Sequence, residues 1–352
     1  MRPRDYYFDN AKFILIFFVV FGHLLKTFIE DNEIIYSLYK TIYTFHMPAF
    51  ILVSGFFAKG IYEKGYVRKF AKKLILPYII FQIIYSIFYF YLYSKSTFKM
   101  DLLNPHWSLW FLISLFFWNL MLLAFSKAGP VNGLAASLVI ALLVGYVDSV
   151  SNYLSLSRTF VFFPMFLLGY HLRRDHLKQL VHLKGRAIAF SIFAVVFIGF
   201  YFYPDINYKW LLGSKPYSEL EAHGVISMLT RLGFYMVSLI MVFSFLAFVP
   251  SKQYFFTKWG KQTLYVYLLH GFIVRFFRES EITGFFTSVE NFLLLAAISL
   301  LMTMILSSSV IASFAQPIIE LKMNRFKGLY KKLVLYIRFY RERWKNQTSS
   351  YN

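Results

Sequence analysis

The amino-acid sequence predicts an all-α, polytopic integral membrane protein with about ten transmembrane helices. Of its 352 residues, 58% are hydrophobic and only 15% are charged, whereas soluble domains usually carry about a quarter charged residues. Aromatic residues reach 22%, which is typical of lipid-facing helices with interfacial tyrosine and tryptophan belts. Together these observations exclude a sizeable water-soluble domain.

Ten apolar stretches occupy most of residues 1–320, the predicted transmembrane domain. Most have about 17 to 25 residues, enough to cross a hydrocarbon layer as a helix. Each is expected to be helical because a strand with unpaired edges is not viable in lipid. The fifth carries glycines at both ends and the sixth is short. In order, the stretches are residues 13–29, 38–58, 74–93, 108–126, 132–147, 159–170, 187–203, 225–248, 263–277 and 291–315.

The loops between these stretches alternate in charge. One set carries 26 lysines and arginines against 6 acidic residues, and the other set carries 10 against 11. Because positive residues collect in cytoplasmic loops, both termini are expected in the cytoplasm of a multi-pass cell-membrane protein. The net charge of +20 is then explained by topology and attraction to anionic membrane lipid, not by nucleic-acid binding. The basic segments are the N-terminus, residues 59–73, Lys127, residues 173–186, residues 252–261 and the tail from Lys322.

Two further inferences concern the chain's ends and its capacity to bind metal. The first span carries charge at its start and lacks a small-residue cleavage site, so it is expected to be a retained helix. Residues 321–352 mix basic with apolar side chains and are expected to form a basic amphipathic cytoplasmic tail. The chain has no cysteine, which excludes disulfides and thiolate metal sites, and no metal is expected.

Ionisable residues in the first helix are candidates for function, because charge at membrane depth is costly. Lys12 and His23 are eleven residues apart, which places them on one helical face about 16 Å apart. Ile16 and Val19 continue the same stripe. Asp9 and Lys12 have the spacing of an ion pair, and Lys12 can reach the interface. That pairing leaves His23 unexplained.

A second histidine, His46, is expected at a similar depth, since the second helix runs back from the outer side. Two imidazoles at one level predict a polar site inside the bundle. The alternative is a pair of structural histidines hydrogen-bonded between helices. Pro48 and the pair Ser54-Gly55 are expected to loosen the helix and allow close approach of backbone or ligand.

The segment from Asp9 to His23 resembles the first helix of the membrane acyltransferase-3 family, whose hallmark is a basic residue, ten intervening residues and a histidine. Asp9 and Lys12, followed by FHMPAF at 45–50 and SGF at 54–56, are most similar to its fucose 4-O-acetylase-like branch. Lys12 departs from the arginine usual in the wider family, which removes a bidentate contact. No serine-esterase domain of the kind that some members append is expected. Further family motifs, in order, resemble RKFAKKLILPY at 68–78, WSLWFL at 107–112, residues 158–170 ending in FLLGY, and LYVYLLH at 264–270.

This resemblance implies transfer of an acyl group, usually acetyl from acetyl-CoA, to a carbohydrate hydroxyl at or across the membrane. His23 could deprotonate the acceptor or take the acyl group itself. His46, Lys12 and Asp9 complete the expected catalytic set.

The two substrates are expected on opposite sides. The phosphates of coenzyme A are expected to bind basic side chains on the cytoplasmic side. The alternative is that these basic side chains only set the membrane topology and bind no ligand. The acceptor sugar is expected at the outer ends of the helices. In a sequence, aromatic residues that bind a sugar there cannot be told apart from an interfacial aromatic belt. Arg158 and Arg231 stand out there, as charges at span edges on the less basic side. The donor candidates are Arg68, Lys69, Lys72 and Lys73, and the acceptor candidates are His106, Trp110, Arg158 and His270.

Two alternative functions share some of these features. An exporter of polysaccharide or lipid-linked sugar would use His23 and His46 in a proton relay, but no inverted repeat is visible. A lipid-modifying acyltransferase would keep the chemistry and change the acceptor. The partners expected for the main hypothesis are membrane lipid, acyl-CoA and a carbohydrate acceptor of a cell-surface polysaccharide or lipid-linked sugar.

Overall fold

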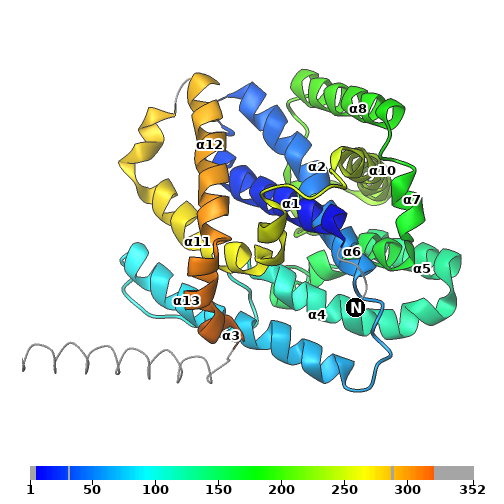
Figure 1. The fold of residues 1–352 in the computed structure, drawn as a ribbon, viewed down its shortest axis with the longest axis horizontal. Coiled ribbons are helices and arrows are strands. Elements are labelled where there is room, and N and C mark those ends of the chain that lie inside the picture. Colours follow the sequence, from blue (N-terminus) through cyan, green and yellow to red (C-terminus); the bar gives the residue numbers. More distant parts are fainter. Residues whose placement is uncertain (1–4, 31, 287–288, 321–352) are drawn as a thin grey trace, which may run out of the picture.

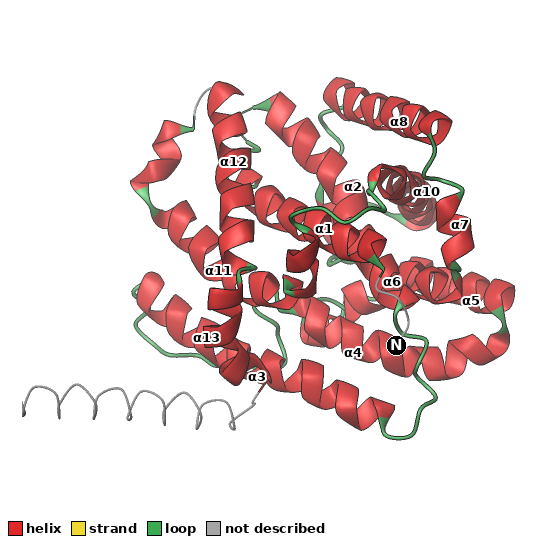
Figure 2. Ribbon diagram, viewed as in Figure 1, coloured by secondary structure: helices red, strands yellow, loops and turns green. Residues whose placement is uncertain are grey.

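The computed structural model describes residues 5–30, 32–286 and 289–320. Throughout these ranges the chain forms helices joined by loops, with no β-strand (Figure 2). The predicted amphipathic tail, residues 321–352, lies outside the described residues. The helices are α1 (Tyr6–Leu25), α2 (Glu33–Phe56), α3 (Tyr66–Leu92), α4 (Trp110–Phe125), α5 (Pro130–Leu143), α6 (Leu156–His171), α7 (Arg174–Lys178), α8 (Leu183–Phe202), α9 (Lys209–Leu212), α10 (Gly224–Phe248), α11 (Thr263–Glu279), α12 (Val289–Leu306) and α13 (Ser309–Glu320), with short 3₁₀ helices η1 (Ser126–Ala128), η2 (Val144–Tyr146), η3 (Tyr153–Ser155), η4 (Ser218–Leu220), η5 (Thr257–Lys261) and η6 (Glu281–Phe285).

Each predicted apolar stretch falls on a helix, and the last falls on the pair α12–α13, which is bent by 61°. Among the described residues, five helices are long and apolar enough to cross a membrane, or six if the bent pair is one span. These are α1, α3, α4 with η1, α8 and α10. The all-α prediction is therefore confirmed, with helices of the length and composition of membrane spans. Ten spans and cytoplasmic termini stay predictions.

Helix α1 lies in the middle of the bundle, where it contacts α2, α11, α12 and η5 (Figure 1). Its start is tied to the loop before η5 by Asn10, whose amide nitrogen donates to the carbonyl oxygens of Pro250 at 2.8 Å and Lys252 at 2.9 Å. The Thr257 hydroxyl donates to the Asn10 side-chain oxygen at 2.6 Å. These buried bonds hold in place the helix that carries His23.

Helices α2 and α6 approach each other closely at two glycines. A Cβ atom added at Gly55 would collide with the carbonyl oxygen of Phe166, and one added at Gly169 would collide with that of Leu52. The close approach predicted for the Ser54-Gly55 pair is therefore confirmed. Small residues at such crossings are the usual way for apolar helices to pack in lipid.

Two loops at the His23 end of α1 are anchored by buried side chains. Lys40 of α2 donates from Nζ to the carbonyl oxygens of Phe200 at 3.3 Å, Tyr203 at 3.4 Å and Pro204 at 3.1 Å. This anchors the loop between α8 and α10. Because Lys40 is fully buried, these carbonyls replace hydrogen bonds that water would otherwise give its ammonium group.

The loop between α3 and α4 is held by Gln82 of α3. Its amide nitrogen donates to the carbonyl oxygens of Asp101 at 2.6 Å and Asn104 at 2.8 Å. Its side-chain oxygen accepts from the backbone N–H of His106 at 2.9 Å. The next residue, Trp107, adopts a φ of +20°, which costs a non-glycine residue on the order of 1–3 kcal/mol. The loop thus fixes Trp107 in a strained position.

Candidate active site

A cavity of about 290 Å³ lies where these two loops meet the ends of α1, α4, α6 and α11 and the middle of α2. None of the described residues that line it is acidic. Its aromatic lining includes Trp107, Trp110 and Tyr208. Its basic lining residues are His23, Lys26, His46, Arg158, Arg275 and Arg278.

His23 is held on three sides. The hydroxyl of Tyr43 lies 3.3 Å from its Nδ1. The centroids of its ring and the Trp107 ring are 4.2 Å apart. On the third side the His270 ring stacks on it, with centroids 5.4 Å apart and an angle of 19° between the planes. The strained loop at Trp107 therefore fixes one face of the imidazole that the sequence singled out.

The hydrogen bonds of His46 and His270 define their tautomers. Nδ1 of His46 lies 2.8 Å from the carbonyl oxygen of Ile42, and Nδ1 of His270 lies 3.0 Å from that of Val266. A carbonyl oxygen only accepts, so both neutral rings carry their proton on Nδ1 and leave Nε2 as an acceptor. Nε2 of His270 is buried and has no hydrogen-bond partner among the described residues.

The cationic side chains of the cavity lie against aromatic rings. Arg158 lies over Trp110, with its guanidinium carbon 5.1 Å from the ring centroid. Arg275 and Arg278 lie over Trp107 at 4.9 and 5.4 Å. Arg278 also donates to the carbonyl oxygen of His23 at 2.6 Å, which ties α11 to the end of α1.

A second cavity of about 180 Å³ adjoins the first and shares Val19, Met47 and Tyr267 with it. Its lining is mostly apolar, and Lys73 of α3 is its one charged lining residue among those described. Ile16 lines it one turn before Val19. The predicted stripe on α1 therefore follows the two cavities as far as His23.

Lys12 and Asp9 form the predicted ion pair, with Nζ 3.0 Å from a carboxylate oxygen. Lys12 also lies over the Phe57 ring, 5.5 Å from its centroid. Neither residue lines either cavity. The predicted catalytic set is therefore split: His23 and His46 line one cavity, and Asp9 and Lys12 lie nearer the start of α1.

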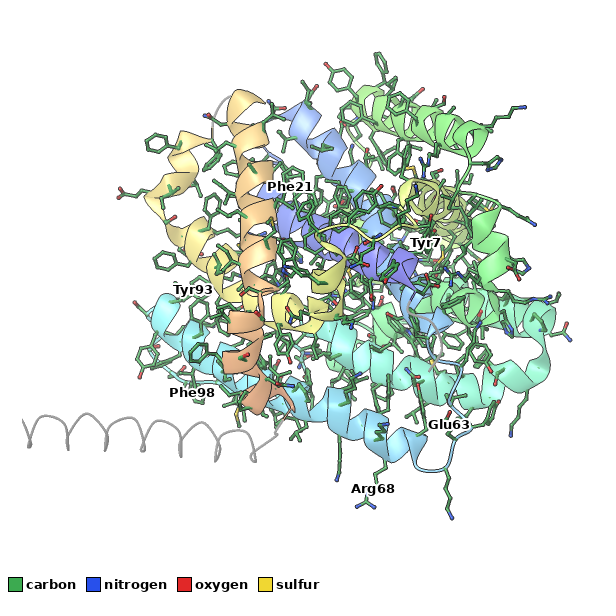
Figure 3. All side chains as sticks on the ribbon, viewed as in Figure 1. Tyr7, Phe21, Glu63, Arg68, Tyr93 and Phe98 are labelled. Carbon is green, nitrogen blue, oxygen red and sulfur yellow. The ribbon has the colours of Figure 1, made fainter. Side chains whose placement is uncertain are left out.

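The donor candidates are on the first two turns of α3. All four are exposed, and the Arg68 side chain points away from the bundle (Figure 3). Only Lys73 of the four lines a cavity. The structure therefore separates Lys73 from its three basic neighbours.

Of the acceptor candidates, Trp110 and Arg158 line the His23 cavity and His270 stacks on His23. His106 lies outside it, with Nε2 2.8 Å from the Ser86 hydroxyl. That hydroxyl donates to the Gln82 carbonyl oxygen, so the imidazole is the donor to Ser86. Burial, followed by the charge of Lys95, lowers the pKa of His106. His106 therefore helps to anchor the loop between α3 and α4 to α3.

Arg231, which the sequence singled out with Arg158, lies elsewhere. It is buried, donates to the carbonyl oxygens of Ala141 at 3.4 Å and Lys215 at 3.1 Å, and lies over the Tyr217 ring.

Sequence reasoning missed four residues that line the His23 cavity, Lys26, Tyr43, Arg275 and Arg278. The criterion that selected Arg158, a charge at a span edge on the less basic side, applies equally to Arg275 and Arg278.

Comparison with known proteins adds the family. A model of the acyltransferase domain matches residues 5–312. The nodulation protein NolL of Sinorhizobium fredii is 32% identical over 155 residues, 40% of this chain and 42% of that protein. The nodulation protein NolL of Mesorhizobium japonicum is 42% identical over 81 residues, 21% of this chain and 22% of that protein. No solved structure matches.

The aligned segments span less than half of either relative, whereas the domain model covers nearly all of the described helices. The resemblance to the acyltransferase-3 family is therefore confirmed, and the fucose 4-O-acetylase-like branch stays a prediction. Together with the apolar helices, the match shows that this chain belongs to the membrane-integral acyltransferase-3 family.

Proposed function

We propose that the protein is an O-acyltransferase of the cell membrane. It moves an acetyl group from cytoplasmic acetyl-CoA to a carbohydrate hydroxyl of a cell-surface polysaccharide or lipid-linked sugar. One observation carries this proposal: His23 lies in a polar cavity that adjoins an apolar cavity lined by Lys73. The two cavities suit two different substrates. The domain family supplies the reaction class.

The apolar cavity suits the narrow pantetheine arm of the donor. Phe70, Lys73 and Leu74 of α3 line it, and the loop charges place this end of α3 on the cytoplasmic side. Lys73 is the basic residue that lines this cavity, and Arg68, Lys69 and Lys72 lie on the same two turns of α3. Charged contacts to the phosphates of coenzyme A would hold the donor while its thioester reaches Val19 and Met47.

In the proposed reaction, Nε2 of His23 takes the proton of the acceptor hydroxyl, while Nδ1–H of His23 keeps its proton and donates a hydrogen bond to the Tyr43 hydroxyl. The hydroxyl oxygen forms a bond to the acetyl carbonyl carbon, and the carbon–sulfur bond of the thioester breaks. The leaving thiolate then receives the proton from His23. Arg158, which faces the same cavity, stabilises the negative oxygen of the tetrahedral intermediate.

Inverted membrane vesicles test this proposal, because they expose the cytoplasmic face to added radiolabelled acetyl-CoA. Vesicles with the wild-type chain should retain label in alkali-labile esters of carbohydrate, and vesicles with His23→Ala should not. His223→Ala is the matched control, because His223 is exposed and lies outside both cavities. Undiminished labelling by His23→Ala would falsify the assigned role.

The transporter alternative has less support. A proton relay from His23 and His46 to the other side would pass through the second cavity, whose lining is mostly apolar. Such a lining holds a pantetheine chain more readily than a chain of water. A lipid-linked acceptor remains part of the proposal.

A further inference from the structure

The His23 cavity has an uncompensated positive charge. Lys26, Arg158, Arg275 and Arg278 line it, and no described lining residue is acidic. The acidic residues Glu30 and Glu33 line a separate depression behind Tyr208, and the ammonium group of Lys26 lies 4.1 Å from the centroid of that tyrosine ring. Basic side chains therefore line the His23 cavity, and acidic side chains line the neighbouring one.

Aromatic faces offset only part of this charge. The contacts of Arg158 with Trp110 and of Arg275 and Arg278 with Trp107 are cation–π contacts. Such contacts are weaker than the cost of taking a guanidinium out of water. Cationic side chains kept together in a cavity whose described lining has no carboxylate therefore favour an anionic ligand.

The hydrogen bonds of the arginines leave capacity for that ligand. One guanidinium nitrogen of Arg278 donates to the His23 carbonyl oxygen, and one of Arg275 donates to the Tyr93 hydroxyl at 3.4 Å. The Nε atoms of both are buried without a hydrogen-bond partner among the described residues. The negative oxygen of the tetrahedral intermediate, which the proposed reaction assigns to Arg158, needs fewer hydrogen-bond donors than the three arginines offer together.

The walls of the same cavity suit a sugar ring. Trp107, Trp110 and Tyr208 each have a cation over the ring, and the aromatic surface that still lines the cavity can pack against the apolar face of a sugar. Planar guanidinium groups match the oxygens of phosphate or carboxylate in pairs. Ring and anion can therefore be bound side by side, next to His23.

We infer that the acceptor is an anionic sugar, carrying a phosphate or a carboxylate on or next to the ring that is acylated. Arg275 and Arg278 bind the negative group and place the reacting hydroxyl at His23. This inference rests on the proposed function, because it takes the His23 cavity to be the acceptor site.

Binding of simple sugars to the full-length protein tests the inference without acetyl-CoA. The protein in phosphatidylcholine nanodiscs is titrated calorimetrically with glucose-1-phosphate, glucuronic acid and methyl glucoside. At least one of the two anions should bind about tenfold or more tightly than the neutral sugar. Arg275→Gln should remove most of that difference, and Arg275→Lys should restore part of it.

Controls separate a specific site from general attraction. Lys99→Gln removes the same charge from an exposed residue of the α3–α4 loop and should leave all three affinities unchanged. If Arg275→Gln does not fold, Arg278→Gln replaces it with the same expected loss. Equal affinity for anionic and neutral sugars, or no measurable binding of either anion, would overturn the inference. So would displacement of the anions by phosphatidylglycerol, which would make a lipid headgroup the occupant.

Acetyl transfer, measured separately with radiolabelled acetyl-CoA, separates this inference from the proposed function. Arginine-dependent binding of anions without any transfer to a sugar would leave the anion site standing and remove the acyltransferase role. Transfer to methyl glucoside and to the anionic sugars at equal rates, unaffected by Arg275→Gln, would leave the enzyme standing and remove the anionic acceptor.

Discussion

The imidazole rings of His270 and His23 stack with their centroids 5.4 Å apart, although the two residues belong to the first and the eleventh α-helix. The Val266 carbonyl fixes the proton of His270 on Nδ1, so the ring meets His23 as a neutral neighbour. A neutral partner tolerates the imidazolium that the proposed general-base step would create at His23 better than a second cation would.

His270→Phe should therefore lower turnover about tenfold or more, because the ring of His23 loses a polar neighbour and its fixed orientation. His270→Gln places an amide near the position of Nε2 and should recover much of the rate. Initial rates of acetyl transfer at saturating acetyl-CoA measure both. If the two variants lose activity equally while their yields match wild type, His270 does not act through Nε2.

Lys73 should contribute more to donor binding than its neighbours, because it alone of the four basic residues lines a cavity. Lys73→Gln should weaken acetyl-CoA binding about fivefold, the effect of one exposed charge pair, and Arg68→Gln should weaken it less. Equilibrium binding of acetyl-CoA to purified protein measures this. Lys127→Gln, at an exposed position after α4, is the control, and an equal effect of all three changes would contradict a specific phosphate contact.

Gly55→Ala should destabilise the protein by about 1–3 kcal/mol, because the added methyl group meets the backbone of α6 and a packed crossing does not open without cost. The midpoint of thermal unfolding in detergent reports the change. Gly199→Ala in α8, where the added Cβ meets nothing within 4 Å, should be neutral or slightly stabilising. Equal midpoints for the two variants would rule out the tight crossing.

Lys40→Met should loosen the loop between α8 and α10, because three carbonyl oxygens lose their shared donor. The expected cost is about 1–3 kcal/mol, with faster proteolysis between residues 203 and 223. Mass spectrometry of the fragments locates the cuts. Lys209→Met, at an exposed residue of the same loop, should digest at the wild-type rate; if Lys40→Met does too, the anchor is unimportant.

The loop charges predict which residues face the outside. Reporter fusions at Ser94 and Lys215 should be active outside, and fusions at Lys64 and Asn352 should be active inside. An external signal from Asn352 would mean that one span is misassigned, and the sixth apolar stretch, on the 16-residue helix α6, would be re-examined first.

Much of the arrangement along single helices was predictable. The stripe from Ile16 to His23 does line the cavities, the Asp9–Lys12 pair forms, and His46 shares a cavity with His23. Each follows from helical periodicity or from depth in the membrane, which a sequence records.

What the sequence did not predict depends on how helices are rotated against one another. Arg275 and Arg278 face the cavity because of the way α11 packs on α1 and α3. Lys12 turns toward Phe57, away from both cavities. His106 is directed by Gln82 and Ser86, two side chains of another helix. Rotation is decided by side-chain packing between elements, and no single-helix pattern contains it.

The shared wall of the two cavities has a consequence for the cell's energy supply. Val19, Met47 and Tyr267 are all that the two hollows have in common, and the Tyr267 hydroxyl is bonded to the Ser108 carbonyl oxygen. Two apolar side chains and a tethered phenol leave no row of polar groups along which protons could hop. In the proposed reaction only the thioester of the donor would cross this boundary, so acyl transfer would not by itself discharge the membrane.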